Sequence, residues 1–245
     1  MAKLNESILQ TASSTILFDR DIFGHISDAE FIATHWPISS PVTTGLRSSG
    51  RGNTLIVKGD QGEFVLRHFI RGGLIGRLVS DSYFWLGEEA TRVFHEWRLL
   101  SKLITMNLPV PQPAAARYVR SGLIYKADLL TVLIPDVIPL SNRIAGPCTK
   151  EFWQKLGEDI APFHKAGVFH ADLNAYNIQI DKEDKLWLLD FDRGKLCQPG
   201  PGQQKNLVRL HRSLQKIKHL DTELHYSEAN WEQFLNGYFN VSRFA

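Results

Sequence analysis

The sequence predicts an α+β protein with a β-rich first part and a mainly helical second part. Two short β-rich runs, 54–57 and 63–68, are joined by a turn that carries Gly59 and Gly62. Further along, apolar residues recur at helical spacing over 149–167 and 207–217. Between these parts, the stretch IPDVIPL contains two prolines, at 135 and 139, and such a stretch favours a linker. We therefore expect two domains, residues 1–135 and residues 136–245.

The remaining elements follow from local pattern. A helix is expected over 28–34, because a Trp-Pro pair at 36–37 would end it. Strands are expected at 115–120 and 123–133, after a proline-rich loop over 108–113. An amphipathic helix that ends before Pro109 is predicted by five apolar residues at helical spacing: Val93, Phe94, Trp97, Leu100 and Leu103.

Composition excludes some classes of function and leaves others open. The net charge is only +2 over 245 residues, so bulk electrostatics give no case for nucleic acid as a partner. Cys148 and Cys197 are far apart and show no metal or redox spacing, which suggests a reducing cytoplasmic setting. Since no apolar run reaches the roughly 18 residues of a membrane helix, any membrane association is expected to be peripheral.

Polar residues surround a short apolar hairpin in the segment GVFHADLNAYNIQIDKEDKLWLLDFDRG, 167–194. Strands 178–181 and 186–189 around a four-residue turn would set residue 181 opposite 186 and Asn177 opposite Asp190. Carboxylate and amide oxygens are the ligands that Mg²⁺ prefers. We therefore expect Asn177 and Asp190 to hold a metal ion at one end of the hairpin.

Asp172 lies on the loop that enters the same end of the hairpin, five residues before Asn177. A carboxylate there can accept the proton of an attacking hydroxyl, so Asp172 is the candidate catalytic base. The spacing HxDxxxxN arises by chance roughly 0.02 times in a chain of this composition, so its presence favours function over strand capping. His170 and His164 are expected to be structural, with His170 holding the loop by a hydrogen bond.

The first part contains candidates for binding phosphate. Gly50 and Gly52 precede a strand and indicate either a phosphate-binding loop or an ordinary turn. The choice stays open because Leu55 occupies the position of the third glycine in the phosphate-loop pattern G-x-G-x-x-G. Arg67 would supply a cation for phosphate, and Glu96 on the amphipathic helix would orient it through an ion pair.

HADLNAYN followed by LLDFD resembles the catalytic loop and metal motif of the protein-kinase-like fold. This resemblance implies a β-rich N-lobe, a mainly helical C-lobe, a nucleotide site in the cleft, and ATP with Mg²⁺ as cofactors. The loop has Ala171 where an arginine is usual, which is typical of kinases that are not regulated by activation-loop phosphorylation. Asp192 replaces the last glycine of the metal motif, so we expect no flipped inactive state.

From about Thr44 onward the chain resembles the 3-deoxy-D-manno-octulosonic acid (Kdo) kinase family, which is related to the lipopolysaccharide core heptose kinases. The resemblance rests on VLRHFIRGGLIGRL from Val65, TRVFHEWRLL from Thr91, IPDVIPL from Ile134, and HADLNAYNI with WLLDFDRG. It implies ATP-dependent phosphorylation of a Kdo hydroxyl, expected to be O4, on lipid A precursor. It also implies a peripheral protein at the cytoplasmic face of the inner membrane of a Gram-negative bacterium.

Arginines near the predicted site are candidates for contacting an anionic acceptor: Arg71, Arg77 and Arg193. With Arg67, His68 and the nearby YFWLG segment, they would form a basic and aromatic surface suited to a glycolipid. Equally, Phe84 and Trp85 could belong to the core. The alternatives left open are a kinase acting on core heptose, another small molecule or a protein, and a nucleotide-binding pseudokinase scaffold. The short stretch after Asp190 disfavours a protein acceptor, and the presence of Asp172, Asn177 and Asp190 disfavours a pseudokinase.

Overall fold

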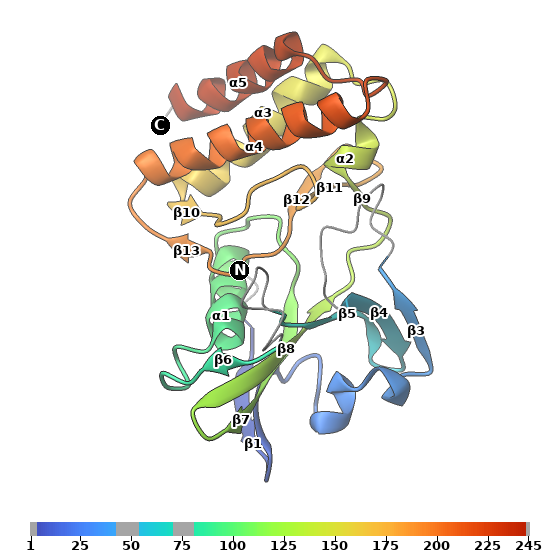
Figure 1. Cartoon of the computed structure of the whole chain (residues 1–245), viewed down its shortest axis with the longest axis vertical. Coiled ribbons are helices and arrows are strands. Elements are labelled where there is room, and N and C mark those ends of the chain that lie inside the picture. The colour runs from blue at the N-terminus through green and yellow to red at the C-terminus, as the bar shows by residue number, and fades with distance from the viewer. Residues whose placement is uncertain (1–3, 43–53, 71–80, 244–245) are drawn as a thin grey trace. The chain divides into compact units, whose positions relative to one another are not determined.

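The computed structural model describes residues 4–42, 54–70 and 81–243, and the chain divides into two compact units (Figure 1). The first unit consists mainly of residues up to 134 and is built on an antiparallel sheet. The second unit takes residues 135–245 together with 108–110, and it is mainly helical. The α+β fold class is therefore confirmed.

The sheet of the first unit has the strand order β1-β2-β7-β8-β5-β4-β3, and β6 pairs with β8. All pairs are antiparallel. The predicted hairpin at 54–68 is present as β4 and β5, and the strands predicted at 115–120 and 123–133 are present as β7 and β8. The bounds are β1 Glu6–Gln10, β2 Ser14–Asp19, β3 Ile38–Pro41, β4 Thr54–Gly59, β5 Gly62–His68, β6 Tyr83–Phe84, β7 Pro113–Ser121 and β8 Ile124–Val132.

Helix α1, Arg92–Thr105, packs on one face of this sheet, as its apolar stripe predicts. Val93, Phe94 and Trp97 of α1 are fully buried against residues of β7 and β8. Successive residues of a strand point to opposite faces, so Arg67 faces α1 while Leu66 and His68 face the other side. This alternation places the side chains of Arg67 and His68 on opposite faces of the sheet.

The helix predicted over 28–34 is wrong in type. Two 3-10 helices, η1 Asp28–Phe31 and η2 Ala33–His35, occupy the segment and cover the other face of the sheet. Ser27 and Glu30 cap η1 reciprocally, which fixes its start. Ile32 between the two turns has φ −112° and ψ 119°, an extended conformation that interrupts any continuous helix.

The second unit contains three long helices, which are α3 Lys150–Lys165, α4 Pro201–Leu220 and α5 Glu228–Arg243. Helices α3 and α5 pack closely at Gly157 of α3, which faces the turn of α5 between Phe234 and Tyr238. A Cβ built on Gly157 would lie 2.0 Å from the carbonyl oxygen of Phe234. Only glycine allows this approach of the two backbones. The short elements are α2 Leu140–Arg143, β9 Ile138–Pro139, β10 Val168–Phe169, β11 Ile178–Ile180, β12 Leu186–Leu188 and β13 Lys195–Leu196.

The hairpin β11–β12 forms where it was predicted, but its predicted register is wrong by one residue. Ile178 pairs with Leu188, so Asn177 lies opposite Leu189 and not opposite Asp190. The turn has three residues, 182–184, because Asp181 pairs with Lys185 and Asp184 adopts a left-handed φ of 55°. The carboxylate of Asp181 accepts hydrogen bonds from the backbone N–H of Glu183 and of Lys185, which stabilises this tighter turn.

Candidate active site

His170 connects the loop before the hairpin to the end of β12. Its Nε2 lies 2.8 Å from the carbonyl oxygen of Leu189, and its Nδ1 accepts a hydrogen bond of 3.1 Å from the backbone N–H of Asp172. These two bonds require the neutral ring with its proton on Nε2. Burial lowers the pKa of His170, which favours the same neutral form. His170 therefore holds the loop, as predicted, and the edge of its ring packs on the fully buried Phe191.

Hydrogen bonds fix the backbone of Asp172 on both sides. Its N–H is bound by His170, and its carbonyl oxygen accepts from the Nδ2 groups of Asn174 and Asn177, at 3.1 and 2.9 Å. Asn174 also starts the following turn, since its Oδ1 accepts from the N–H of Tyr176 and of Asn177. The side chain of Asp172 is 56% exposed, so the loop presents a carboxylate to solvent on an immobilised backbone.

Asn177 and Asp190 come close together through Leu189. The N–H of Leu189 donates to the carbonyl oxygen of Asn177 at 2.8 Å, and Asp190 is the next residue. Because the Nδ2 of Asn177 is bound to Asp172, its Oδ1 is the amide atom suited to a metal ion. Asp190 has a left-handed φ of 61°, a conformation that Asp tolerates better than most residues. One carboxylate and one amide oxygen are donor types that Mg²⁺ takes, so these two residues remain the candidate ligands.

Helix α4 binds the loop 170–175 through three polar side chains, a contact that the sequence reasoning missed. Asn206 is buried and makes two hydrogen bonds with the backbone of His170, accepting from its N–H at 3.0 Å and donating to its carbonyl at 2.6 Å. One helical turn away, Arg209 Nη1 lies 3.0 Å from Asp172 Oδ1. Ser213 Oγ accepts from the N–H of Ala175 at 3.2 Å. The signal was a row of polar residues, spaced three and four apart, beside the apolar stripe of the same helix.

In the first unit, Arg67 and Glu96 form the predicted ion pair. Glu96 is 2% exposed, and a carboxylate so deeply buried requires a bound cation. The guanidinium of Arg67 also lies over the ring of Phe69, at 4.6 Å from its centroid. The pairing joins residues 29 positions apart and depends on the packing of α1 on the sheet that contains β5.

Four of the predicted site residues lie outside the described residues: Gly50, Gly52, Arg71 and Arg77. Arg193 is described and is exposed, at a left-handed φ of 60° directly after the metal motif. Asp192, in contrast, does not adopt a left-handed φ, so its position has no need of the glycine that the related motif carries.

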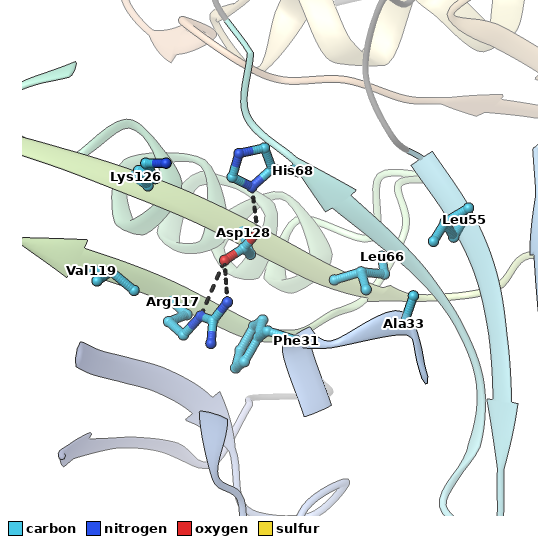
Figure 2. A pocket seen from close by; sticks show the side chains of 9 residues that line it. All are labelled: Phe31, Ala33, Leu55, Leu66, His68, Arg117, Val119, Lys126 and Asp128. Carbon is cyan, nitrogen blue, oxygen red and sulfur yellow. Dashed lines mark hydrogen bonds and ion pairs between the residues drawn. The ribbon is translucent and has the colours of Figure 1, made fainter. Parts of the chain in front are cut away.

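A cavity of about 330 Å³ opens on the sheet of the first unit, on the face away from α1 (Figure 2). Figure 2 shows Asp128 between His68 and Arg117, at 2.6 and 2.7 Å. The hydrogen bond that His68 donates to the Asp128 carboxylate raises the pKa of His68, and Arg117 also binds Asp28 at 3.1 Å. The charges in this cavity are thus already paired. His68 does not join Arg67 in one basic surface, contrary to expectation, because the two side chains lie on opposite faces of β5.

A loop that positions a carboxylate, followed by an amide and carboxylate pair at a hairpin end, defines a phosphotransferase of the kinase type. Residues 43–238 match the lipopolysaccharide kinase (Kdo/WaaP) family, and the chain belongs to this family. The predicted resemblance is confirmed, and with it the class of enzyme.

Relatives in this family are similar over most of their length. The chain is 41% identical over 221 residues to a 3-deoxy-D-manno-octulosonic acid kinase of Vibrio parahaemolyticus, covering 90% of this chain and 92% of the relative. It is 42% identical over 205 residues to proteins of the same name from Xylella fastidiosa and Stenotrophomonas maltophilia, covering 83% of this chain and 81% of each relative. Among the helices of the described residues, none is long and apolar enough to span a bilayer.

Proposed function

We propose that this protein transfers the γ-phosphoryl group of ATP to a hydroxyl of Kdo, specifically O4, on lipid A precursor. The observation that carries the proposal is the continuous chain of hydrogen bonds that joins Asp172, His170, Leu189 and Asn177 and ends beside Asp190. The names of the relatives supply the acceptor. The two units would be the N-lobe and C-lobe of a protein-kinase-like fold, divided near residue 135.

In the proposed reaction, the acceptor oxygen attacks the γ-phosphorus while the bond from this phosphorus to the oxygen of ADP breaks. Asp172 orients the hydroxyl and takes its proton. Asn177 and Asp190 would hold Mg²⁺, which supplies charge neutralisation on the phosphate oxygens. Arg67, oriented by Glu96, would contact phosphate from the first unit together with the backbone at Gly50 and Gly52, and Arg193 would contact the acceptor with Arg71 and Arg77. Most of the rate gain would come from alignment and electrostatics.

The test of the reaction is incubation with ATP, Mg²⁺ and Kdo-bearing lipid A precursor, followed by mass spectrometry for one added phosphate. We expect Asp172→Ala to abolish transfer and to leave ATP affinity within about twofold, because the residue faces the acceptor. Asp159→Ala, which removes a half-buried carboxylate of α3 that pairs with Lys155, is the matched control and should retain activity. Normal turnover by Asp172→Ala would exclude the base assignment, and phosphorylation of free sugars in preference to the glycolipid would exclude the acceptor.

We also propose that the protein associates peripherally with the inner membrane. Four large apolar side chains, the apolar tip, are unusually exposed in the first unit: Phe84 (69%), Leu86 (82%), Leu123 (77%) and Ile124 (39%). Phe84 lies opposite Ile124 on the antiparallel strands β6 and β8 (Figure 1), and the N–H of Trp85 donates to the carbonyl of Leu123, so the four residues are neighbours along this strand pair and its turn. Trp85, between Phe84 and Leu86, is half-buried and Arg120 lies over its ring, an arrangement suited to a membrane interface.

Vesicle sedimentation tests this association without ATP or acceptor. The apolar tip exposes on the order of 450 Å², which is well below the roughly 800 Å² per partner of a stable protein interface, so a lipid surface is the better match. Phe84→Ser with Leu123→Ser should lower binding to phosphatidylethanolamine and phosphatidylglycerol vesicles at least tenfold. Ile38→Ser, at a site of similar exposure on β3, should not. Equal binding by both variants would exclude the patch as the membrane contact.

A further inference from the structure

Arg209 contacts the candidate base but plays no part in the reaction as outlined above. Its Nη1 lies 3.0 Å from Asp172 Oδ1, and the two side chains are 53% and 56% exposed. An ion pair this exposed adds little to stability, so stability alone does not explain the contact. The exposure also means that a molecule reaching the Asp172 carboxylate meets the guanidinium at the same time.

The guanidinium has more hydrogen-bonding capacity than Asp172 uses. Arginine carries five N–H donors in a planar fork, and the contact to Asp172 involves one nitrogen. The rest of the fork matches a carboxylate in shape and charge. The guanidinium of Arg209 can therefore bind two carboxylates at once. One edge would hold Asp172 and another would hold a carboxylate of the acceptor.

The surroundings of Arg209 favour an anion. Helix α4 spans 20 residues without an Asp or Glu, and Lys205, Arg209, Arg212 and Lys216 lie on its exposed side. Residues four apart on a helix share a face, so Lys205 and Arg209 stand on the same side, and a positive potential extends along α4 to Asp172. A neutral sugar would gain nothing from this field, whereas an acidic sugar would be drawn toward the base.

We infer that Arg209 forms a subsite for the carboxylate of the acceptor, and that it binds this group while holding Asp172. The inference rests on the proposed function, in which the acceptor is a sugar acid. Its consequence is specificity: an acid positioned by Arg209 has its hydroxyls presented to a base that the same side chain orients. A sugar without a carboxylate loses both the attraction and the alignment.

The experiment compares two acceptors, Kdo-bearing lipid A precursor and its Kdo methyl ester, which keeps every hydroxyl and removes the negative charge. The quantity measured is the ratio of kcat/KM for the acid to that for the ester. We expect the wild-type ratio to be about ten to one hundred, the range of one charged hydrogen bond. Arg209→Gln lowers activity on both acceptors through its effect on Asp172, and it also brings the ratio close to one. Arg209→Lys, which keeps the charge, should give an intermediate ratio.

Lys205→Gln is the control, since it removes a positive charge from the same helix and leaves Arg209 in place. It should retain the wild-type ratio. Equal losses on acid and ester in Arg209→Gln would overturn the subsite and leave Arg209 as a positioning residue alone. A rise in the KM for ATP with an unchanged ratio would overturn it in favour of a nucleotide contact. Wild-type transfer to both acceptors at equal rates refutes only this inference, whereas transfer to neither refutes the proposed function itself.

Discussion

Replacing Asn206 by alanine should damage both stability and catalysis, because this side chain holds the backbone of His170 from inside the second unit. The variant loses an accepted bond of 3.0 Å and a donated bond of 2.6 Å, and it leaves a buried N–H and a buried carbonyl of His170 without protein partners. Each such group costs about 1–3 kcal/mol, so the loss should be about 2–6 kcal/mol. This is a large share of the roughly 5–15 kcal/mol that stabilises a typical domain.

The catalytic effect follows from the same bonds. His170 binds the N–H of Asp172, so a backbone that relaxes at 170 moves the base, and a displacement of about 1 Å can cost about a hundredfold in rate. Urea unfolding, monitored by tryptophan fluorescence, gives the free energy of unfolding. Phosphate transfer to the glycolipid acceptor gives kcat for the same preparation. Gln204→Ala, on the exposed side of α4, is the control.

Asn206→Asp is the more stringent variant. Its carboxylate can still accept from the N–H of His170, but it would face the carbonyl oxygen of His170 where the amide now donates. We therefore expect no rescue relative to alanine. If Asn206→Ala unfolds at the wild-type urea concentration and keeps the wild-type kcat, then the bonds to His170 carry neither role and the reasoning fails.

Two further predictions concern the helices of the second unit. Gly157→Ala should cost about 3 kcal/mol or more in thermal unfolding, because its Cβ would meet the carbonyl of Phe234, whereas Gly146→Ala, with 3.8 Å to the nearest atom, should be close to neutral; equal melting temperatures would contradict the helix contact. Burial lowers the pKa of His164 from 6.5 to about 4. As the pH falls, this histidine is therefore protonated in the unfolded chain before it is protonated in the folded protein. Stability present at pH 7 should therefore decline below about pH 6.5, by about 2 kcal/mol at pH 5 from this residue. Urea titrations should show that His164→Gln loses less between these pH values, and parallel curves would refute the assignment.

The parts of the fold that could be predicted were those with a clear periodicity of apolar residues in the sequence. The stripe from Val93 to Leu103 gave α1, and the alternation on either side of Gly59 and Gly62 gave β4 and β5. Strand β2 was missed because it is buried along its whole length and so shows no alternation, and β1 was missed because its sequence ESILQ does not alternate although its burial does. The 3-10 turns were missed because a single extended residue, Ile32, separates them, and pattern does not reveal such a break.

The site divides in the same way. Asp172, Asn177 and Asp190 were proposed from their spacing along the chain, whereas Asn206, Arg209 and Ser213 belong to a separate helix, α4, that starts at Pro201. Their contacts depend on how α4 packs, and a single sequence does not determine that packing. Polar residues at helical spacing more often form a solvent-exposed face than a face that hydrogen-bonds a loop. The sequence pattern alone could not distinguish these two arrangements.

Asn177 and Asp190 remain predicted metal ligands although the hairpin register differs from the expected one, because both are linked to Leu189. The prediction joined Asn177 to Asp190 by direct pairing across the strands, which a three-residue turn rules out. In the structure the two are joined through the backbone of Leu189, whose N–H binds Asn177 and whose carbonyl binds His170. His170 in turn binds Asp172. Backbone groups and one neutral histidine therefore link the chain at residues 172, 177 and 189, so a shift of one residue in the strand register changes which bonds are made without breaking this link.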